Sequence, residues 1–268
     1  MTNYDKQNRK LQKLTNERDE AIAQAERSER ERSRLYGILD GIMHETRRLN
    51  SEIASSCEEV SKSISRSDYT QASLHADDAF YTSGLISSRL TFTDFEINPE
   101  SLLRQTRYSA GVYKKFDKAR RILSRAANRR GINIRLQGPS RNEIDVLPAF
   151  EMVPFVLIDN AVKYSPDRQE ILVEVQDNPT PGCRAQAIIT SVGPMVPADE
   201  LPKLLTRGFR GSLAARSRIP GEGIGLYLAD TLVRLSNGSL HLSSSSVPMY
   251  SVENIEYSTF IVTVKFRQ

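Results

Sequence analysis

The sequence contains no tryptophan, only two cysteines and only three histidines among its 268 residues. Cys57 and Cys183 have neither CxxC nor metal-ligand spacing, so we expect both to be reduced thiols. No run of about 18 apolar residues is present, which argues against a membrane-spanning helix, and the charged N-terminus does not resemble a signal peptide. These absences predict a cytoplasmic protein with no direct membrane span.

A predominance of one sign of charge is also lacking. The 37 basic and 33 acidic residues give a formal net charge of +4. In the N-terminal third of the chain the two signs are interleaved, and the basic residues do not cluster with aromatic ones. This pattern is typical of a solvated helix face, and we expect no nucleic-acid partner.

The first sixty residues carry apolar or small side chains at spacings of three and four, a heptad pattern typical of a coiled coil. The positions that follow it are Leu11, Leu14, Ala21, Ala25, Leu35, Leu39, Ile42, Leu49, Ile53 and Val60. With Leu39 at position a and Ile42 at position d, four polar residues fall into the same stripe. They are Arg18, Ser28, Arg32 and Thr46. Because one helix cannot bury this stripe alone, we expect a homodimer that is weakly paired before residue 34.

A second helix is predicted over residues 69–95, because small and apolar residues recur on one of its faces. These are Ala76, Ala79, Ser83, Ile86 and Leu90. The turn between the two helices is expected at residues 65–68, where Ser67 or Asp68 can cap the helix that follows. Two such helices from each of two chains would form a four-helix bundle.

After Asn98 the pattern changes to a mixture of helices and strands. We predict a helix over about residues 99–130 that ends at Gly131, a helix within residues 154–166, and another after Gly225. Strands are expected at residues 132–136, 143–147, 171–176, 185–190, 239–243 and 259–266. The predicted fold class is therefore α+β: an N-terminal coiled-coil helix, a two-helix hairpin, and an α/β sandwich whose helices cover one face of a mixed sheet.

Two segments of this C-terminal part carry residues suited to binding a nucleotide. The helix within residues 154–166 ends in a polar face that bears Asn160, Lys163 and Tyr164. Residues 221–226 read Gly-Glu-Gly-Ile-Gly-Leu and open a second helix. Such a glycine-rich turn presents backbone N–H groups and a helix N-terminus to phosphates.

A third motif lies on the long N-terminal helix, where His44 is followed by Glu45. In the heptad register His44 falls at position f, opposite the apolar stripe, so its imidazole should point into solvent. A neutral imidazole is a competent nucleophile near neutral pH, because its ordinary pKa is about 6.5.

These three motifs, in this order, resemble those of sensor histidine kinases with a GHKL-type ATPase domain. The resemblance implies a coiled-coil helix at residues 1–36, dimerisation and histidine phosphotransfer helices at 37–98, and a catalytic ATP-binding domain at 99–268. It also implies an ATP-dependent protein histidine autokinase that passes its phosphoryl group to an aspartate of a response regulator receiver domain. Because no sensor domain precedes the bundle, the signal is expected to enter through the coiled coil or an upstream sensor protein.

The resemblance assigns roles to the motif residues. His44 would accept the phosphoryl group, with Glu45 accepting a hydrogen bond from one of its ring nitrogens. Asn160 would bind Mg²⁺, Lys163 would contact the phosphates, and Tyr164 would stack on the adenine.

Further nucleotide contacts are implied by two glycine boxes and the segment between them. Ser191 and Gly193 belong to the first glycine box, whereas Phe209 and Arg210 match the Phe box at the edge of the ATP lid. The second glycine box supplies Gly221, Gly223, Gly225 and Leu226.

Two positions depart from the family pattern. Val156 stands where kinases of this type carry a second asparagine and ATP-hydrolysing relatives carry a glutamate, which argues against an ATP-hydrolysing machine. Ser191 stands where an aspartate usually fixes the adenine amino group, so adenine should be held less tightly. Asp177 cannot replace that aspartate, because it comes too early, in a predicted turn between two strands. These departures leave an alternative open: a catalytically weak pseudokinase acting as a phosphotransfer or scaffold dimer.

Overall fold

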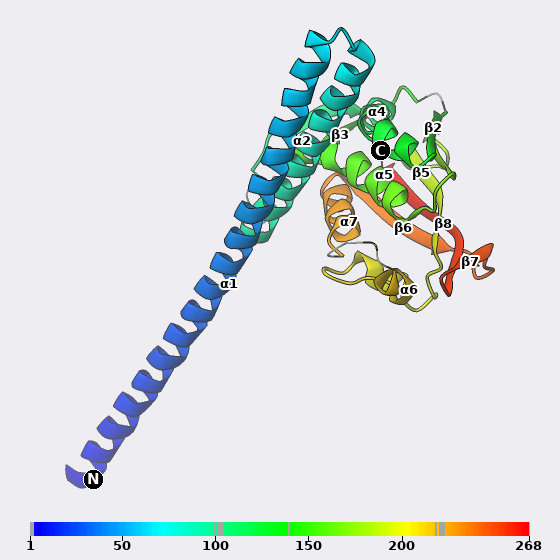
Figure 1. The fold of residues 1–268 in the computed structure, drawn as a ribbon. Coiled ribbons are helices and arrows are strands. Elements are labelled where there is room, and N and C mark those ends of the chain that lie inside the picture. The colour runs from blue at the N-terminus through cyan, green and yellow to red at the C-terminus, as the bar shows by residue number, and fades with distance from the viewer. Residues whose placement is uncertain are drawn as a thin grey trace. The chain divides into compact units, whose positions relative to one another are not determined.

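The computed structural model describes residues 3–98, 100, 104–138, 140–217, 219 and 223–267. The chain divides into two compact units, Met1–Arg48 and Leu49–Gln268. The first unit contains the N-terminal part of helix α1 (Asn3–Ser65), and the second contains the rest of α1 and all other elements (Figure 1). None of the helices in these described ranges is long and apolar enough to cross a membrane.

The N-terminal part of α1 is a solvated helix. All side chains described between residues 12 and 33 are exposed, including Leu14 at a heptad core position. Its charged residues form ion pairs one turn apart, such as Arg30 with Glu26 at 3.0 Å. This confirms the interpretation of the interleaved charges. The pairing of this helix with a second chain stays a prediction.

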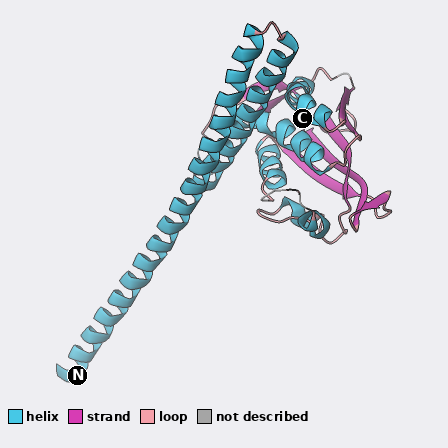
Figure 2. Cartoon of the chain, viewed as in Figure 1, coloured by secondary structure: helices cyan, strands magenta, loops and turns pink. Residues whose placement is uncertain are grey.

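The predicted turn between the first two helices is confirmed. Helix α2 spans Tyr69–Ile97 and begins after a tight turn in which Ser67 has a φ of 58° (Figure 2). The Asp68 carboxylate accepts a hydrogen bond from the Gln71 backbone N–H at 3.0 Å. Of the two candidates for the N-cap, Asp68 therefore takes the role.

A six-stranded mixed sheet forms the centre of the second unit. Its strands are β2 (Asn133–Gln137), β4 (Glu170–Asp177), β5 (Cys183–Pro194), β6 (Gly238–Ser244), β7 (Tyr250–Val252) and β8 (Ile255–Arg267). They are arranged in the order β2-β4-β5-β8-β6, and β7 pairs with β8. Only β2 and β4 are parallel, and the other pairs are antiparallel. A separate two-stranded sheet joins β1 (Tyr108–Gly111) to β3 (Glu143–Val146).

Three helices pack against the sheet: α4 (Val112–Arg129), α5 (Met152–Tyr164) and α7 (Gly225–Leu235) (Figure 1). Alternate residues of the strands enter the core beneath them, as Ile171, Val173 and Val175 of β4 do. Shorter helices complete the unit: η1 (Pro148–Glu151), η2 (Pro202–Leu205) and α6 (Ser212–Arg216). The predicted α/β sandwich is therefore confirmed, as are its strands to within a few residues at their ends.

The helix predicted over residues 99–130 was wrong in its first part. Residues 108–111 form strand β1, and helix α4 begins only at Val112. Ala110 of β1 lies opposite Ile144 of β3, and both are buried, so pairing with a distant strand overrides local helix preference here. Pro99 and residues 101–103 lie outside the described residues. The predicted end is confirmed, because Gly131 follows α4 with a φ of +66°.

Asp177 confirms the predicted hairpin connection. It ends β4, and its carboxylate accepts hydrogen bonds from the Ser140 hydroxyl and the Arg141 and Asn142 backbone N–H groups. Burial would raise the pKa of Asp177, but these hydrogen bonds hold it below its usual value. Asp177 therefore fixes the loop before β3.

Cys57 and Cys183 form no disulfide, as predicted.

Candidate functional site

Helix α5 carries the three polar residues that the sequence singled out. Its apolar residues Val153, Leu157 and Ile158 are buried in the core. Asn160, Lys163 and Tyr164 occupy the last turn and are partly exposed. Because an α-helix has 3.6 residues per turn, residues at positions i, i+3 and i+4 share one face, and the polar residues are therefore separated from the apolar ones. The ammonium group of Lys163 lies 5.8 Å from the centre of the Tyr164 ring.

Both glycine boxes lie against α5. A Cβ atom added to Gly193, near the end of β5, would lie 3.9 Å from the Cβ of Tyr164. A Cβ atom added to Gly225, at the start of α7, would lie 3.0 Å from Cγ1 of Val156. Val156 lies one turn before Asn160, so the end of β5 and the N-terminus of α7 meet at the helix that carries the polar residues.

Gly223 can only be a glycine in this arrangement. Its φ is +71°, and an added Cβ atom would lie 2.5 Å from the carbonyl oxygen of Phe209. The backbone N–H of Gly208 donates a hydrogen bond to the Gly223 carbonyl at 3.1 Å. Gly223 is thus packed against residues 208–209, next to the backbone N–H groups of the first turn of α7. Gly221 and Glu222 lie outside the described residues.

Ser191 is buried in β5, with 6% of its surface exposed, and pairs with Phe260 of β8. Gly193 pairs with Ser258, whose hydroxyl lies 3.1 Å from that of Ser244. Ser244 in turn accepts a hydrogen bond from the backbone N–H of Val196 at 3.1 Å. This hydroxyl pair beside the first glycine box was missed from the sequence, because it depends on how both β5 and β6 pair with β8.

Arg210 is engaged within its own segment. Its Nη2 atom donates hydrogen bonds to the carbonyls of Ala214 and Ile219, both at 2.8 Å. Phe209 beside it is partly buried. A contact between Arg210 and a phosphate stays a prediction, and these two hydrogen bonds engage only its Nη2 atom.

His44 is exposed, with 72% of its side chain accessible, as the heptad register predicted. Its Nε2 atom lies 3.7 Å from Oδ1 of Asp40, one turn earlier on α1. This neighbour was missed, although its spacing of four residues was a usable signal. The side chain of Glu45 lies outside the described residues.

A partly buried pair connects the hairpin helix α2 to the helix of the candidate site. The hydroxyl of Tyr81 donates a hydrogen bond to Oδ1 of Asp159 at 3.0 Å, and Asp159 directly precedes Asn160. Burial raises the pKa of Asp159, whereas the Tyr81 hydrogen bond and the charge of Lys163 act in the opposite direction. Burial, followed by the negative charge of Asp159, also raises the pKa of Tyr81.

Two ion pairs hold α2 to α4 in the same region. Asp77 pairs with Arg125 at 2.7 Å, and Asp78 pairs with Arg129. Together with the Tyr81 hydrogen bond, they fix α2 against the domain that carries the candidate site.

The residues present fit a nucleotide with its magnesium ion. Within the described ranges, no group of three or more His, Cys, Asp or Glu side chains could hold a metal ion. Mg²⁺ needs no such cage, because it keeps several waters and is bound through phosphates and one or two protein oxygens. The amide oxygen of Asn160 can supply one of these, whereas the apolar Val156 supplies none.

Comparisons with known proteins cover the part of the chain that carries this site. Residues 149–268 match the family model of histidine kinase-, DNA gyrase B- and HSP90-like ATPases. The mycobacterial sensor histidine kinase MprB is similar at 20% identity, over 61% of this chain and all of that structure, with a TM-score of 0.44. The Acinetobacter baumannii histidine kinase AdeS is similar at 15% identity, over 84% of this chain and 98% of that one, with a TM-score of 0.45. A comparison with curated proteins gave no match.

Residues 149–268 therefore lie in an α/β domain that matches the GHKL class of ATPase domains, the class defined by this family model. The match supports a histidine kinase with a GHKL catalytic domain, which confirms the resemblance predicted from the three motifs.

Proposed function

We propose that this protein is an ATP-dependent protein histidine autokinase of a two-component phosphorelay. The observation that carries the proposal is the meeting of Asn160, Lys163 and Tyr164 with the end of β5 and the glycine turn before α7. This arrangement brings together a cation, an amide that can ligate a metal, an aromatic ring and the backbone N–H groups of a helix N-terminus, which are the groups that bind a nucleoside triphosphate. The exposed imidazole of His44 is the proposed acceptor.

The proposed reaction is a phosphoryl transfer in two steps. A ring nitrogen of His44 forms a bond to the γ-phosphorus of ATP, the bond from that phosphorus to the β,γ-bridging oxygen breaks, and ADP leaves. The other ring nitrogen gives its proton to a carboxylate of Asp40 or Glu45, or to water. An aspartate carboxylate of a response regulator then takes the phosphoryl group, a proton returns to the ring from water or the carboxylic acid, and the neutral imidazole is regenerated.

The protein contributes mainly by positioning and charge neutralisation. Lys163 and the N–H groups at the start of α7 would bind the phosphates, and Tyr164 and Ser191 would hold the adenine. Asn160 would hold Mg²⁺, which would neutralise the charge of the phosphates. The proposed partners are a second copy of this chain, a response regulator receiver domain, and an upstream sensor protein.

Incubation of the purified protein with radiolabelled ATP and Mg²⁺ tests the proposal. We expect a label on the protein that is lost in acid and retained in base, as phosphohistidine requires. His44→Gln should abolish this label while leaving nucleotide binding within about twofold. A label that persists in His44→Gln would remove His44 as the acceptor.

A catalytically weak pseudokinase is the second candidate, and it is favoured by one observation. Val156 is buried against Gly225, so a family metal ligand is replaced by apolar packing. A pseudokinase of this kind should carry no acid-labile label, although the chain would still form a phosphotransfer or scaffold dimer. Calorimetry with ATP in the presence of Mg²⁺ separates a weak nucleotide site from an absent one.

A further inference from the structure

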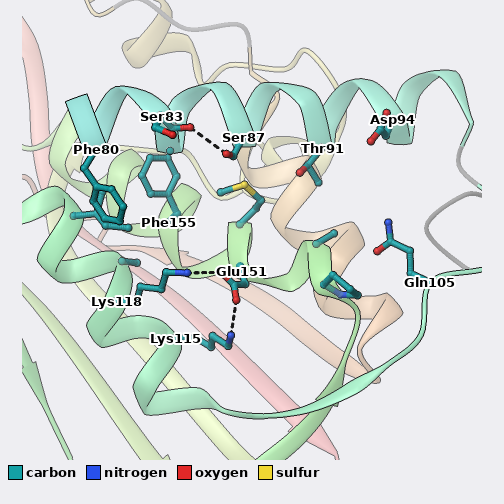
Figure 3. Close-up of a pocket in the computed structure, with 16 residues that line it drawn as sticks. Phe80, Ser83, Ser87, Thr91, Asp94, Gln105, Lys115, Lys118, Glu151 and Phe155 are labelled. Atoms are coloured by element: carbon teal, nitrogen blue, oxygen red, sulfur yellow. Dashed lines mark hydrogen bonds and ion pairs between the residues drawn. The ribbon is translucent and has the colours of Figure 1, made fainter. Parts of the chain in front are cut away.

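Helix α5, which carries the candidate nucleotide site, is attached at both of its ends to α4 or to the residue that follows α4. At the N-terminal end, Glu151 directly precedes α5 and accepts hydrogen bonds from the ammonium groups of Lys115 and Lys118 of α4, each at 2.6 Å (Figure 3). The C-terminal end meets Arg130, the residue directly after α4. Because α5 has 13 residues, its two ends are about 20 Å apart, and only the second attachment lies near the candidate site.

The C-terminal end of α5 lacks a backbone donor that an uninterrupted helix would supply. The Val162 carbonyl would ordinarily accept a hydrogen bond from the N–H of residue 166, but Pro166 has no N–H. Proline also disfavours a helical conformation in the residue before it, and Ser165 is extended, with φ −70° and ψ 141°. Val162 and Ser165 are both buried, so their carbonyl oxygens need a donor from the protein.

The guanidinium group of Arg130 supplies these donors. Its Nη1 atom donates to the Val162 carbonyl at 2.7 Å, and its Nη2 atom donates to the Ser165 carbonyl at 2.6 Å. Its Nε atom donates to Oδ1 of Asp167 at 2.8 Å. The planar fork of a guanidinium can meet two carbonyls at once, and its positive charge is favourable at a helix C-terminus. Arg130 therefore caps the turn that carries the candidate site.

The backbone of Arg130 is itself fixed. Its N–H donates to the Ala127 carbonyl at 2.9 Å, which closes α4, and its carbonyl accepts a hydrogen bond from the Arg168 N–H at 2.9 Å. Three residues later Asn133 begins β2 and pairs with Glu170 of β4. Arg130 thus lies at a junction between α4 and the sheet, from which its side chain reaches the end of α5.

We propose that Arg130 is a positioning residue of the nucleotide site. By satisfying the carbonyls that Pro166 leaves without a helical donor, it keeps the last turn of α5 in place. Lys163 and Tyr164, the final two residues of that turn, are thereby held where the phosphates and the adenine would bind. This role rests on the proposed function, and it concerns ATP binding and not the transfer to His44.

Calorimetric titration of the full chain with ATP and Mg²⁺, at a temperature where every variant is folded, tests this role. Arg130→Met keeps an unbranched apolar stem but removes every donor, so it should weaken ATP binding about tenfold. Arg130→Lys offers a single ammonium group in place of the fork, and it should recover part of that loss. Lys118→Met is the matched control, because it removes an ion pair at the opposite end of α5. It should lower the unfolding temperature but leave the ATP affinity within about twofold.

A second readout requires no nucleotide. The chain contains no tryptophan, so Tyr164→Trp places a single indole on the last turn of α5. In this background Arg130→Met should lower the fluorescence anisotropy of the indole, because the turn loses its cap. Lys118→Met should leave the anisotropy unchanged.

Equal ATP affinity in Arg130→Met and in the wild-type protein would overturn the role of Arg130 while leaving the proposed function intact. Unchanged anisotropy in Arg130→Met would overturn it as well, since the turn would then not depend on the guanidinium group. Absence of ATP binding by the wild-type protein would refute the proposed function, and with it the role of Arg130. If Arg130→Met does not fold, Arg130→Lys decides, because wild-type ATP affinity in that variant contradicts the need for the fork.

Discussion

At the scale of single residues, the Tyr81 to Asp159 hydrogen bond is the contact on which the candidate site most depends. In it Tyr81 donates to the carboxylate of Asp159, which directly precedes Asn160. Its loss would leave the charged form of the partly buried Asp159 without that donor, a situation that costs about 1–3 kcal/mol.

We therefore expect Tyr81→Phe to lower the free energy of unfolding by about 1–3 kcal/mol at about pH 7.5. The pKa of Asp159 is already raised by burial, and removing the donor raises it further. Because the pKa of Asp159 is higher in the folded state, the folded state binds more protons than the unfolded state between the two pKa values. Stability therefore falls as the pH rises from the unfolded-state pKa through the folded-state pKa. The destabilisation by Tyr81→Phe should accordingly shrink toward about pH 4, where the carboxyl becomes protonated.

Urea unfolding at the two pH values measures this difference. Tyr69→Phe is the matched control, because Tyr69 lies on the same helix with 70% of its surface exposed. A pH-independent loss of stability in Tyr81→Phe would show that the ring packing against Phe155, and not the hydrogen bond, is what the variant disturbs.

Ser191 gives the second prediction at this scale. A carboxylate at this buried position would add a charged hydrogen bond to the adenine amino group, worth about 1.5–3 kcal/mol. Ser191→Asp should therefore tighten ATP binding about tenfold or more in calorimetry. Ser251→Asp, an exposed serine on β7, controls for the added charge. Unchanged affinity in Ser191→Asp would mean that adenine is held by other groups.

At the scale of elements, the glycine turn before α7 determines how closely the start of that helix approaches residues 208–209. Both Gly223 and Gly182 have a positive φ, +71° and +76°, so an alanine at either position costs about 1–2 kcal/mol in backbone strain. Only Gly223 also has backbone atoms where its Cβ would be, since no atom lies within 4 Å at Gly182.

Gly223→Ala should therefore shift the turn and weaken ATP binding about tenfold or more, whereas Gly182→Ala should lower stability alone. Calorimetric titration with ATP and thermal unfolding of both variants separate the two effects. Equal ATP affinity in the two variants would exclude the turn from nucleotide binding.

At the scale of the whole molecule, the heptad stripe of α1 predicts an obligate dimer through residues 35–95. In the single chain Leu39 is 43% exposed and Met43 is 49% exposed, which leaves apolar surface for a partner. Leu39→Asp combined with Ile42→Asp should convert the dimer to a monomer in light scattering. Deletion of residues 1–30 should leave the dimer intact, because polar residues interrupt the stripe there. A wild-type monomer at micromolar concentration would refute this interface.

Local pattern was sufficient to predict much of this protein. The 3.6-residue period placed Asn160, Lys163 and Tyr164 on one helix face, the Asp68 cap followed from its position before α2, and alternation identified the strands. Each of these features depends on residues within a few positions of one another, where backbone geometry leaves few choices.

Features that depend on contacts between distant segments of the chain could be determined only from the tertiary structure. Strand β1 forms because it pairs with β3, some 35 residues later, and so it replaced the start of a predicted helix. Tyr81 and Asp159, which form a hydrogen bond, are separated by 78 residues along the chain. The sequence by itself determined the elements and the motifs that resemble a histidine kinase. The packing of those elements determined which side chains meet, because such contacts are formed by the fold and carry no periodic signal along the chain.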